Sequence, residues 1–216
     1  WMPRGRTAGK ARSSRRRPSQ ARSREMVEAL LRGAARVLVR RGYAGASTNH
    51  IAEAAGASVG SLYEYFANKE AIFERLAEAH IDAAEALLSA RFAALSACGE
   101  RPSLRAILDA LVGAMIELHA EEPELHHRLA TEVPLTAKVR ARVEALEARA
   151  VEGLSLLLTD HPEVRAPVAL AAPLVVEAAD ALTHRWFAQG ALARDPEVAA
   201  RELRLLFLGY LGGAGR

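Results

Sequence analysis

Three histidines among several glutamates are the residues of this sequence whose types could bind a metal ion. His119, His126 and His127 lie in a short acidic stretch, and the glutamates beside them are Glu117, Glu121, Glu122, Glu124 and Glu132. A di-metal helical bundle needs a His-x-x-x-His or Glu-x-x-His pair repeated on a second helix, and the sequence has no such repeat. We interpret the stretch as a short polar helix over the edge of a core, and we predict no metal site.

Other signatures of catalysis are also missing from the sequence. It contains no glycine-rich phosphate loop, no nucleophile elbow and no paired-carboxylate pattern. We therefore predict no catalytic residue and no cofactor, and we expect that the protein is not an enzyme.

Charge is distributed unevenly along the 216 residues, whose formal net charge is +3. Residues 1–70 hold 14 of the 29 Lys and Arg but only 5 of the 26 Asp and Glu, so this end is strongly basic and the remainder is acidic. A basic end suits a polyanion, either nucleic acid or an anionic membrane surface. The membrane is the weaker alternative, because the N-terminal arginines have no interleaved Leu, Phe or Trp to insert.

Cysteine content and apolar runs indicate a cytoplasmic protein that does not enter a membrane. The single cysteine, Cys98, permits no intramolecular disulfide, which favours a reducing compartment. The N-terminus is polar and arginine-rich, unlike a secretory signal. The longest apolar run, residues 166–176, is shorter than the roughly 18–20 residues that span a bilayer.

Composition and periodicity predict an all-α protein of about nine helices. Alanine is abundant, aromatic residues make up 5% of the chain, and no segment reads convincingly as a strand. Residues 1–23 have too few apolar side chains to fold alone, so we expect a basic, disordered arm. Two folded units should follow, at residues 24–70 and 71–216. The arm either enters the minor groove or follows the backbone of DNA, or it is a non-specific electrostatic attractor.

The stretch from Ser47 to Ile72 reads as helix, tight turn, helix. Apolar and small residues give the first helix a face for close packing, and Gly56 supplies the turn. Ser58 can cap the second helix, while Leu62 and Phe66 anchor that helix to the core. A short helix with small residues in its first turn can enter a DNA major groove.

This stretch resembles the DNA-binding domain of the tetracycline-repressor (TetR) family of bacterial transcription regulators. The matching positions are Gly42-Tyr43, Ile51-Ala52, Ala55-Gly56, Ser58, Gly60, Leu62-Tyr63, Tyr65-Phe66 and Lys69-Glu70. The sequence departs from the family pattern at Leu38, at Ala57 and at the Asn49-His50 pair, where Phe, Val and Arg-Asp are usual. The resemblance implies a helix-turn-helix DNA-binding domain at 24–70 and a ligand-binding and dimerisation domain at 71–216.

Position and chemistry assign DNA-contact roles within this motif. Groups at a helix N-terminus suit a phosphate, and small residues in the first turn of the second helix suit base edges. The resemblance implies phosphate contacts for the Tyr-x-Tyr-Phe turn. The expected contact residues are Ser47, Thr48, His50, Ser58, Val59, Gly60, Ser61, Tyr63, Tyr65 and Lys69. Alternatively, the two tyrosines only pack the three-helix unit, and His50 belongs to a helix cap.

By resemblance, the C-terminal unit holds a pocket for a small hydrophobic or aromatic effector. The candidate lining residues are Phe92, Leu111, Met115, His119, Leu156, His184, Trp186 and Phe187. For any one of them, plain core packing is the alternative role.

The last two expected helices carry apolar stripes that would form a four-helix bundle across a two-fold axis. The candidate interface residues are Leu174, Val175, Ala178, Leu182, Leu203, Leu206, Phe207 and Tyr210, with intrachain core as the alternative. The sequence therefore predicts a homodimeric repressor that a small effector releases from a palindromic operator. The alternative is a helical ligand-binding or enzyme-like protein whose basic end is incidental.

Overall fold

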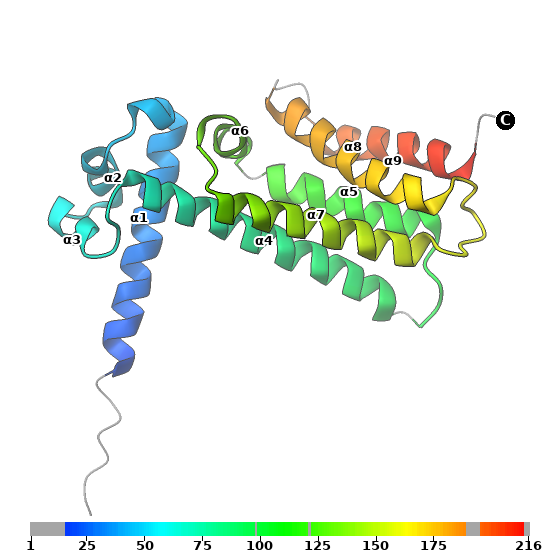
Figure 1. Ribbon diagram of the computed structural model, residues 1–216, viewed down its shortest axis with the longest axis horizontal. Coiled ribbons are helices and arrows are strands. Elements are labelled where there is room, and N and C mark those ends of the chain that lie inside the picture. Colours follow the sequence, from blue (N-terminus) through cyan, green and yellow to red (C-terminus); the bar gives the residue numbers. More distant parts are fainter. Residues whose placement is uncertain (1–15, 98, 121, 189–194, 214–216) are drawn as a thin grey trace, which may run out of the picture.

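The structure is a computed structural model that describes residues 16–97, 99–120, 122–188 and 195–213 (Figure 1). In these ranges every regular element is a helix, which confirms the all-α prediction. The helices are α1 (Arg16–Gly45), α2 (Thr48–Ala55), α3 (Val59–Tyr63), α4 (Lys69–Ala97), α5 (Leu104–Ala120), α6 (Pro123–Glu132), α7 (Ala137–Leu158), α8 (Val168–Ala188) and α9 (Pro196–Gly212). None of the helices described is both long and apolar enough to cross a membrane.

Side-chain caps set the beginnings of several helices, including the one that the sequence predicts at Ser58. Ser47, Ser58, Asn68 and Asp195 each accept a hydrogen bond from the amide three residues ahead, at 3.2, 3.0, 2.8 and 3.1 Å. These bonds satisfy amides that the first helical turn leaves without a backbone partner. Gly56 ends α2 in the left-handed conformation, with φ of 70°.

Helix α1 begins at Arg16, earlier than the boundary expected near residue 24. The prediction of disorder is therefore wrong for residues 16–23, and residues 1–15 lie outside the described part of the chain. Pro18 falls in the first turn, where a missing amide does not matter. Residues 19–25 contain no helix breaker, and extending a helix that is already formed requires no new nucleation.

Helices α1, α2 and α3 and the start of α4 form a compact unit that we call the head (Figure 1). Its centre consists of fully buried apolar side chains from all four helices, among them Leu30, Leu38, Ile51, Leu62 and Phe73. The short α3 depends on this core, since five residues do not form a stable helix alone.

Gly33 sets the distance between α1 and α2. A β-carbon at this position would lie 2.8 Å from the carbonyl oxygen of Ile51 and 3.0 Å from the β-carbon of Ala55. The two helices therefore pack backbone to backbone, which no larger side chain at position 33 would allow. The guanidinium of Arg36 reinforces the contact by donating to the carbonyl of Ala54.

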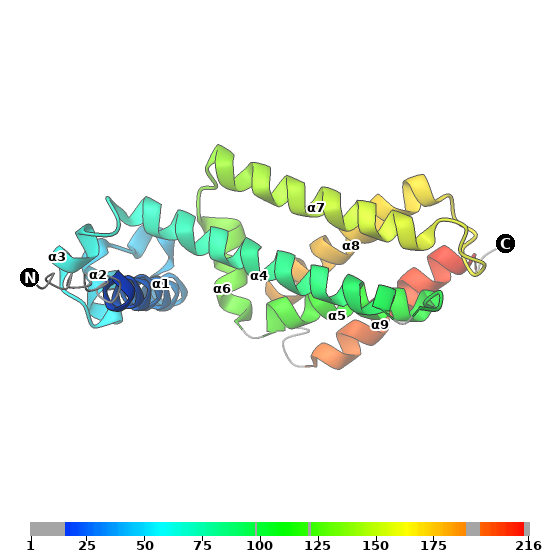
Figure 2. The same cartoon turned by 90° about the horizontal axis from the view of Figure 1, so that it is seen from below.

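Helix α4 runs out of the head into a larger unit of helices α5 to α9 (Figure 2). In this unit α5 contacts α4, α8 and α9, while α7 lies beside α4 and α8. The core is built from buried side chains such as Leu108, Leu154, Val175, Leu203 and Phe207. A continuous helix thus connects the head to the remainder of the molecule.

Candidate DNA interface and ligand cavity

The first turn of α3 presents small residues on the outside of the head. Ser58 accepts a hydrogen bond from the amide of Ser61, and the two hydroxyls are 2.9 Å apart. Gly60 is exposed and Val59 is partly exposed, whereas Leu62 is completely buried and holds the helix in place. Val59, Gly60 and Ser61, which the sequence predicts to contact base edges in the DNA major groove, therefore lie together in the accessible first turn of α3.

Tyr63 and Tyr65 differ in their exposure to solvent. Tyr63 is 53% exposed, and its hydroxyl is 3.2 Å from the hydroxyl of Thr48 at the start of α2. This pair puts two hydroxyl groups beside the N-terminus of α2, where backbone amides also favour an anion. Tyr65 is partly buried and packs against the core of the head, as the packing alternative expects. The amide of His50 donates to Ser47, so the backbone of His50 belongs to the cap of α2.

Lys69 joins α4 to the end of α1. Its ammonium group donates to the carbonyl oxygens of Tyr43 and Ala46 at 3.1 and 3.3 Å, and it lies 4.5 Å from the centre of the Tyr43 ring. An ammonium group has three N–H donors, so one remains for a phosphate. The structure thus gives Lys69 a positioning role that the sequence did not indicate.

The larger unit contains a cavity of about 330 Å³ between α4, α5, α6, α7 and α8. Its wall is mainly apolar, and Ile81, Leu118, Val139, Val143 and Leu146 form much of it. A volume of this size is typical of a site for a small organic molecule.

Four histidines from four different helices meet at one side of this cavity: His80, His119, His126 and His184. The rings of His80 and His126 have centroids 4.0 Å apart, those of His119 and His126 are 4.8 Å apart, and those of His119 and His184 are 4.4 Å apart. Burial lowers the pKa of His80 and of His119 to about 4, and that of His126 to about 3. These three rings are therefore neutral near pH 7.

His119 and His184 face each other with their Nε2 atoms 3.1 Å apart. Nδ1 of His119 donates to the carbonyl of Met115 at 2.6 Å, and Nδ1 of His184 donates to the carbonyl of Asp180 at 3.1 Å. Since both Nδ1 atoms carry a proton, the two Nε2 atoms need one further proton between them to form a hydrogen bond. Burial opposes the charged form of His184, but the hydrogen bond and charge of Asp180 outweigh burial and raise its pKa.

Two carboxylates complete the polar part of the wall. Glu147 comes from α7 and Asp180 from α8, and both also line an adjoining groove between these helices. Burial raises the pKa of Glu147, and the negative charges of Asp180, Glu177 and Glu144 raise it further. Among the described residues, no group of three or more His, Cys, Asp or Glu side chains is arranged to hold a metal ion.

The sequence identified part of this wall. Met115, His119 and His184 line the cavity, and Leu111 lines a smaller neighbouring pocket of about 100 Å³ together with Met115. His126 also lines the cavity, although the sequence analysis named it only among the histidines of the acidic stretch.

Other candidates for the wall lie elsewhere. Phe92 packs against the apolar core of the larger unit, close to Gly153. Leu156 is 74% exposed on the outer face of α7, so the expectation that it lies near the cavity is wrong. The side chains of Trp186 and Phe187 are outside the described part of the structure. The sequence analysis did not find His80, Glu147 and Asp180, which also line the cavity. Each is a single polar residue on a different helix, so no regular spacing along the sequence indicates that they meet.

Two protein-family models match this chain. Residues 30–76 match the model for bacterial regulatory proteins of the tetR family, and residues 103–211 match the tetracyclin repressor-like C-terminal domain. The second match alone covers half of the chain. The chain belongs to the tetR family of bacterial transcription regulators. No curated protein sequence matches it.

Solved structures of tetR-family regulators have the same fold. FadR, a fatty acid degradation regulator from Bacillus halodurans, is 20% identical, with a TM-score of 0.67 over 85% of this chain and 95% of its own. NalD of Pseudomonas aeruginosa, the secondary repressor of a multidrug efflux pump, is 22% identical, with a TM-score of 0.66 over 87% and 98%. FadR from Bacillus subtilis, solved with stearoyl-CoA, is 18% identical, with a TM-score of 0.64 over 86% and 97%. At these identities the likeness concerns the fold.

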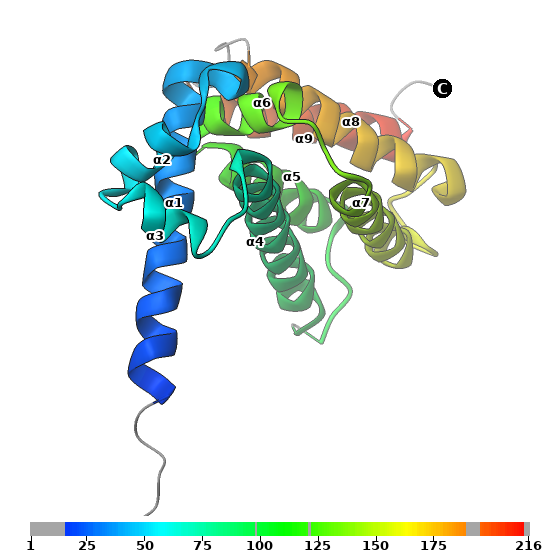
Figure 3. The ribbon, with the colours of Figure 1, turned by 60° about the vertical axis from the view of Figure 1, so that its left-hand side comes forward.

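In this tetR-family protein, α6 connects the cavity with the head. Leu129 lines the cavity and is also part of the buried cluster at the centre of the head, together with Leu125 and Val133. Figure 3 shows α6 beside the end of α1. There the amide of Tyr43 donates to Oε2 of Glu132 at 2.8 Å. Helix α6 therefore contacts both the cavity and the end of α1.

Gly42 makes the contact between α1 and α6 close. Its φ of 69° is unfavourable for other residues, and a β-carbon there would lie 2.7 Å from Oε2 of Glu132. Arg128 holds that carboxylate from the other side at 2.9 Å, and also bonds Glu124 at 2.6 Å.

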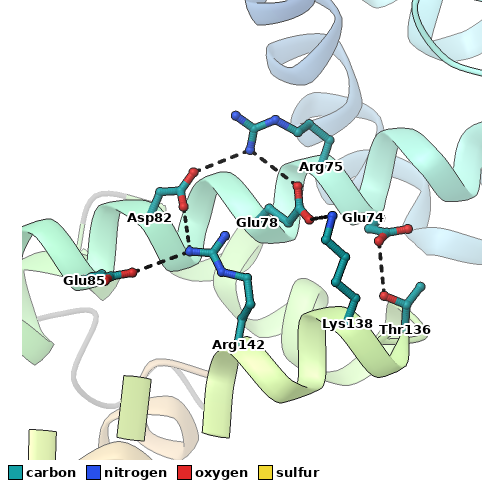
Figure 4. Close-up of polar contacts among 8 residues, drawn as sticks. All are labelled: Glu74, Arg75, Glu78, Asp82, Glu85, Thr136, Lys138 and Arg142. Carbon is teal, nitrogen blue, oxygen red and sulfur yellow. Dashed lines mark hydrogen bonds and ion pairs between the residues drawn. The ribbon is translucent and has the colours of Figure 1, made fainter. Parts of the chain in front are cut away.

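A ladder of ion pairs joins α4 to α7 in this family member (Figure 4). Lys138 bonds Glu78 at 2.6 Å, and Arg142 reaches Asp82 at 2.8 Å and Glu85 at 3.5 Å. Lys138, Arg142, Asp82 and Glu85 are about one-third exposed or more, whereas the side chain of Glu78 is only 14% exposed. A single exposed pair contributes little, but together the pairs favour one register of the two helices. Because α7 lines the cavity and α4 enters the head, the ladder is a second connection between them.

The predicted dimer residues divide into two groups. Leu174 on α8 and Leu206 and Tyr210 on α9 are 49%, 54% and 38% exposed. Exposed apolar side chains in neighbouring positions mark a surface that another protein can cover.

The remaining dimer candidates pack inside the protomer. Val175, Leu203 and Phe207 lie in its own core, as the intrachain alternative expects. Ala178 and Leu182 are partly buried against that core. Helical stripes in a sequence do not reveal which side faces the protomer's own core and which side faces a partner.

Proposed function

We propose that this tetR-family regulator is a homodimeric repressor that a small molecule in the cavity releases from a palindromic operator. The observation that carries the proposal is Leu129, which belongs to the cavity wall and to the core of the head at once. A ligand that fits only one position of α6 would shift the population of head orientations. In this proposal residues 24–70 bind DNA, residues 71–216 bind ligand and dimerise, and the protein acts in the cytoplasm without enzymatic activity.

DNA contacts in the proposal begin at the exposed edge of α3. Val59, Gly60 and Ser61 face the bases, while Thr48 and Tyr63 hold a phosphate beside the start of α2. The exposure of Tyr63 and its contact with Thr48 support this arrangement. Ser47, His50, Ser58, Tyr65 and Lys69 position these groups or add contacts at the edge, and the basic residues preceding α1 add long-range attraction.

Dimerisation in the proposal uses the exposed apolar side chains of α8 and α9. Two copies related by a two-fold axis would present two α3 helices to successive major grooves.

A gel-shift titration on the DNA flanking the gene tests the proposal. We expect a sequence-specific complex, a tenfold or greater loss of affinity in Ser61→Ala combined with Tyr63→Phe, and no loss in Ser89→Ala on the exposed side of α4. Binding that competitor DNA of random sequence abolishes would contradict the proposal. So would equal affinities of the three proteins.

A further inference from the structure

The ionisable side chains that line the cavity and its two neighbouring pockets are carboxylates and histidines. No Lys or Arg is among the described residues that line the cavity, the adjoining groove or the smaller pocket. Glu147 and Asp180 line the cavity and the groove, and the groove adds Glu144, Glu152 and Glu177. A concave surface lined by one sign of charge concentrates ligands of the opposite sign.

Glu147 is the less compensated of the two carboxylates that line the cavity. Within the described residues it has no ion-pair partner, whereas Asp180 bonds Nδ1 of His184 at 3.2 Å. The direction of its pKa shift shows that its neighbourhood resists a negative charge. A cation bound between Glu147 and Asp180 would remove that repulsion. Among the described residues, the basic side chain already paired with one of these carboxylates is His184, which bonds Asp180.

Three of the four cavity histidines add no positive charge that would attract an anion. His80, His119 and His126 are neutral near pH 7, so they accept or donate hydrogen bonds without attracting negative charge. His126 is 8% exposed, and in the described structure its Nδ1 has no hydrogen-bond partner. A buried polar atom without a partner is unfavourable, and a ligand that brings a polar group to this side would relieve it.

We propose that the effector is an amphipathic organic cation, with an apolar body in the cavity and one protonated nitrogen between Glu147 and Asp180. The apolar body contacts Ile81, Leu118, Val143 and Leu146, which cover the wall away from the carboxylates. This inference rests on the proposed function, and it separates the present protein from the regulator solved with stearoyl-CoA. A CoA thioester carries phosphates, which the carboxylates of this cavity would repel.

Three probes of equal chain length test the charge preference: octylammonium, octanol and octanoate. Calorimetric titration of the full chain should show octylammonium binding at least tenfold more tightly than octanol, with octanoate the weakest. Glu147→Gln and Asp180→Asn should each reduce the preference for octylammonium over octanol at least threefold. Glu197→Gln on α9 is the matched control, because this exposed carboxylate lines neither the cavity, the groove nor the smaller pocket, and it should leave the preference unchanged within twofold.

Several results would overturn the inference. These are octanoate binding as tightly as octylammonium, an unchanged preference in both cavity variants, or no binding of any probe. A gel shift without ligand separates this failure from failure of the proposed function. Specific DNA binding that persists leaves the regulator intact and rejects only the cationic effector, whereas loss of specific binding rejects the regulator itself.

Discussion

The amide of Tyr43 donates a 2.8 Å hydrogen bond to the carboxylate of Glu132, and this bond ties the end of α1 to the end of α6. Arg128 holds the same carboxylate at 2.9 Å, so its position depends on α6 as a whole. Three residues before Glu132, Leu129 lines the cavity. The contact therefore connects the ligand cavity to the head over less than one turn of helix.

Replacing Glu132 should loosen this connection. Glu132→Ala removes the acceptor of the Tyr43 amide, so hydrogen exchange of that amide should accelerate about tenfold or more. Glu124→Ala removes the other carboxylate on Arg128 without touching α1, and it should leave the exchange rate of Tyr43 within twofold. Hydrogen-exchange mass spectrometry of the segment around residue 43 measures both rates. Equal protection in Glu132→Ala and the unmodified chain would show that the bond does not hold α1.

Two glycine substitutions should change stability in opposite directions. Gly33→Ala places a methyl group against the backbone of α2, and overpacking of this kind costs about 1–3 kcal/mol. Gly113→Ala is the control, because a β-carbon there meets nothing within 4 Å and alanine favours a helix by about 1 kcal/mol. Denaturant unfolding measures both free energies. A stabilised Gly33→Ala variant would contradict the close approach of α1 and α2.

Local signals made the head predictable from the sequence, whereas the cavity wall was not. Ser58 and Asn68 cap helices within three residues of themselves, and Gly56 adopts its positive φ beside the helix that it ends, so each acts over a few residues of sequence. In contrast, His80 and His184 come together only when helices far apart in the sequence pack.

Helix register was the second limit on prediction from the sequence. Leu156 and Leu154 are two residues apart on α7, yet one is 74% exposed and the other fully buried. A short window of apolar residues does not determine which of two such positions faces inward. For the same reason the sequence analysis predicted that Phe207 lies in a dimer interface, whereas the structure places it in the core of the protomer.

Acid should destabilise the fold through the cavity histidines. Their folded-state pKa values lie near 3–4, below the unfolded value of about 6.5, so the unfolded chain binds more protons in that window. Stability is therefore full above about pH 6.5 and falls as the pH drops toward 4. Between pH 7 and pH 5 we expect a loss of about 2 kcal/mol for each of these histidines, or roughly 4–8 °C in Tm per histidine. His184 acts in the opposite direction, since its pKa is raised.

A variant tests which residues cause this acid sensitivity. Thermal unfolding of His126→Leu should show a smaller decrease in Tm between pH 7 and pH 5 than the unmodified chain. His127→Leu, the adjacent residue that does not line the cavity, should keep the full decrease. An identical pH dependence of all three proteins would show that the cavity histidines are not responsible.

The basic N-terminal segment should govern the salt dependence of DNA binding. Deleting residues 1–22 removes eight of the arginine and lysine residues that can release counterions from DNA. We expect weaker binding and a shallower slope of log affinity against log salt concentration, measured by fluorescence anisotropy. An unchanged slope in the truncated protein would contradict a role for the segment on DNA.

Selection of binding sites from random DNA by the full-length protein tests the central claim most directly. The account predicts an enriched site with two-fold symmetry that binds two chains per duplex, as measured by light scattering of the complex. Enrichment of no sequence, or of an asymmetric site bound by a single chain, would contradict it.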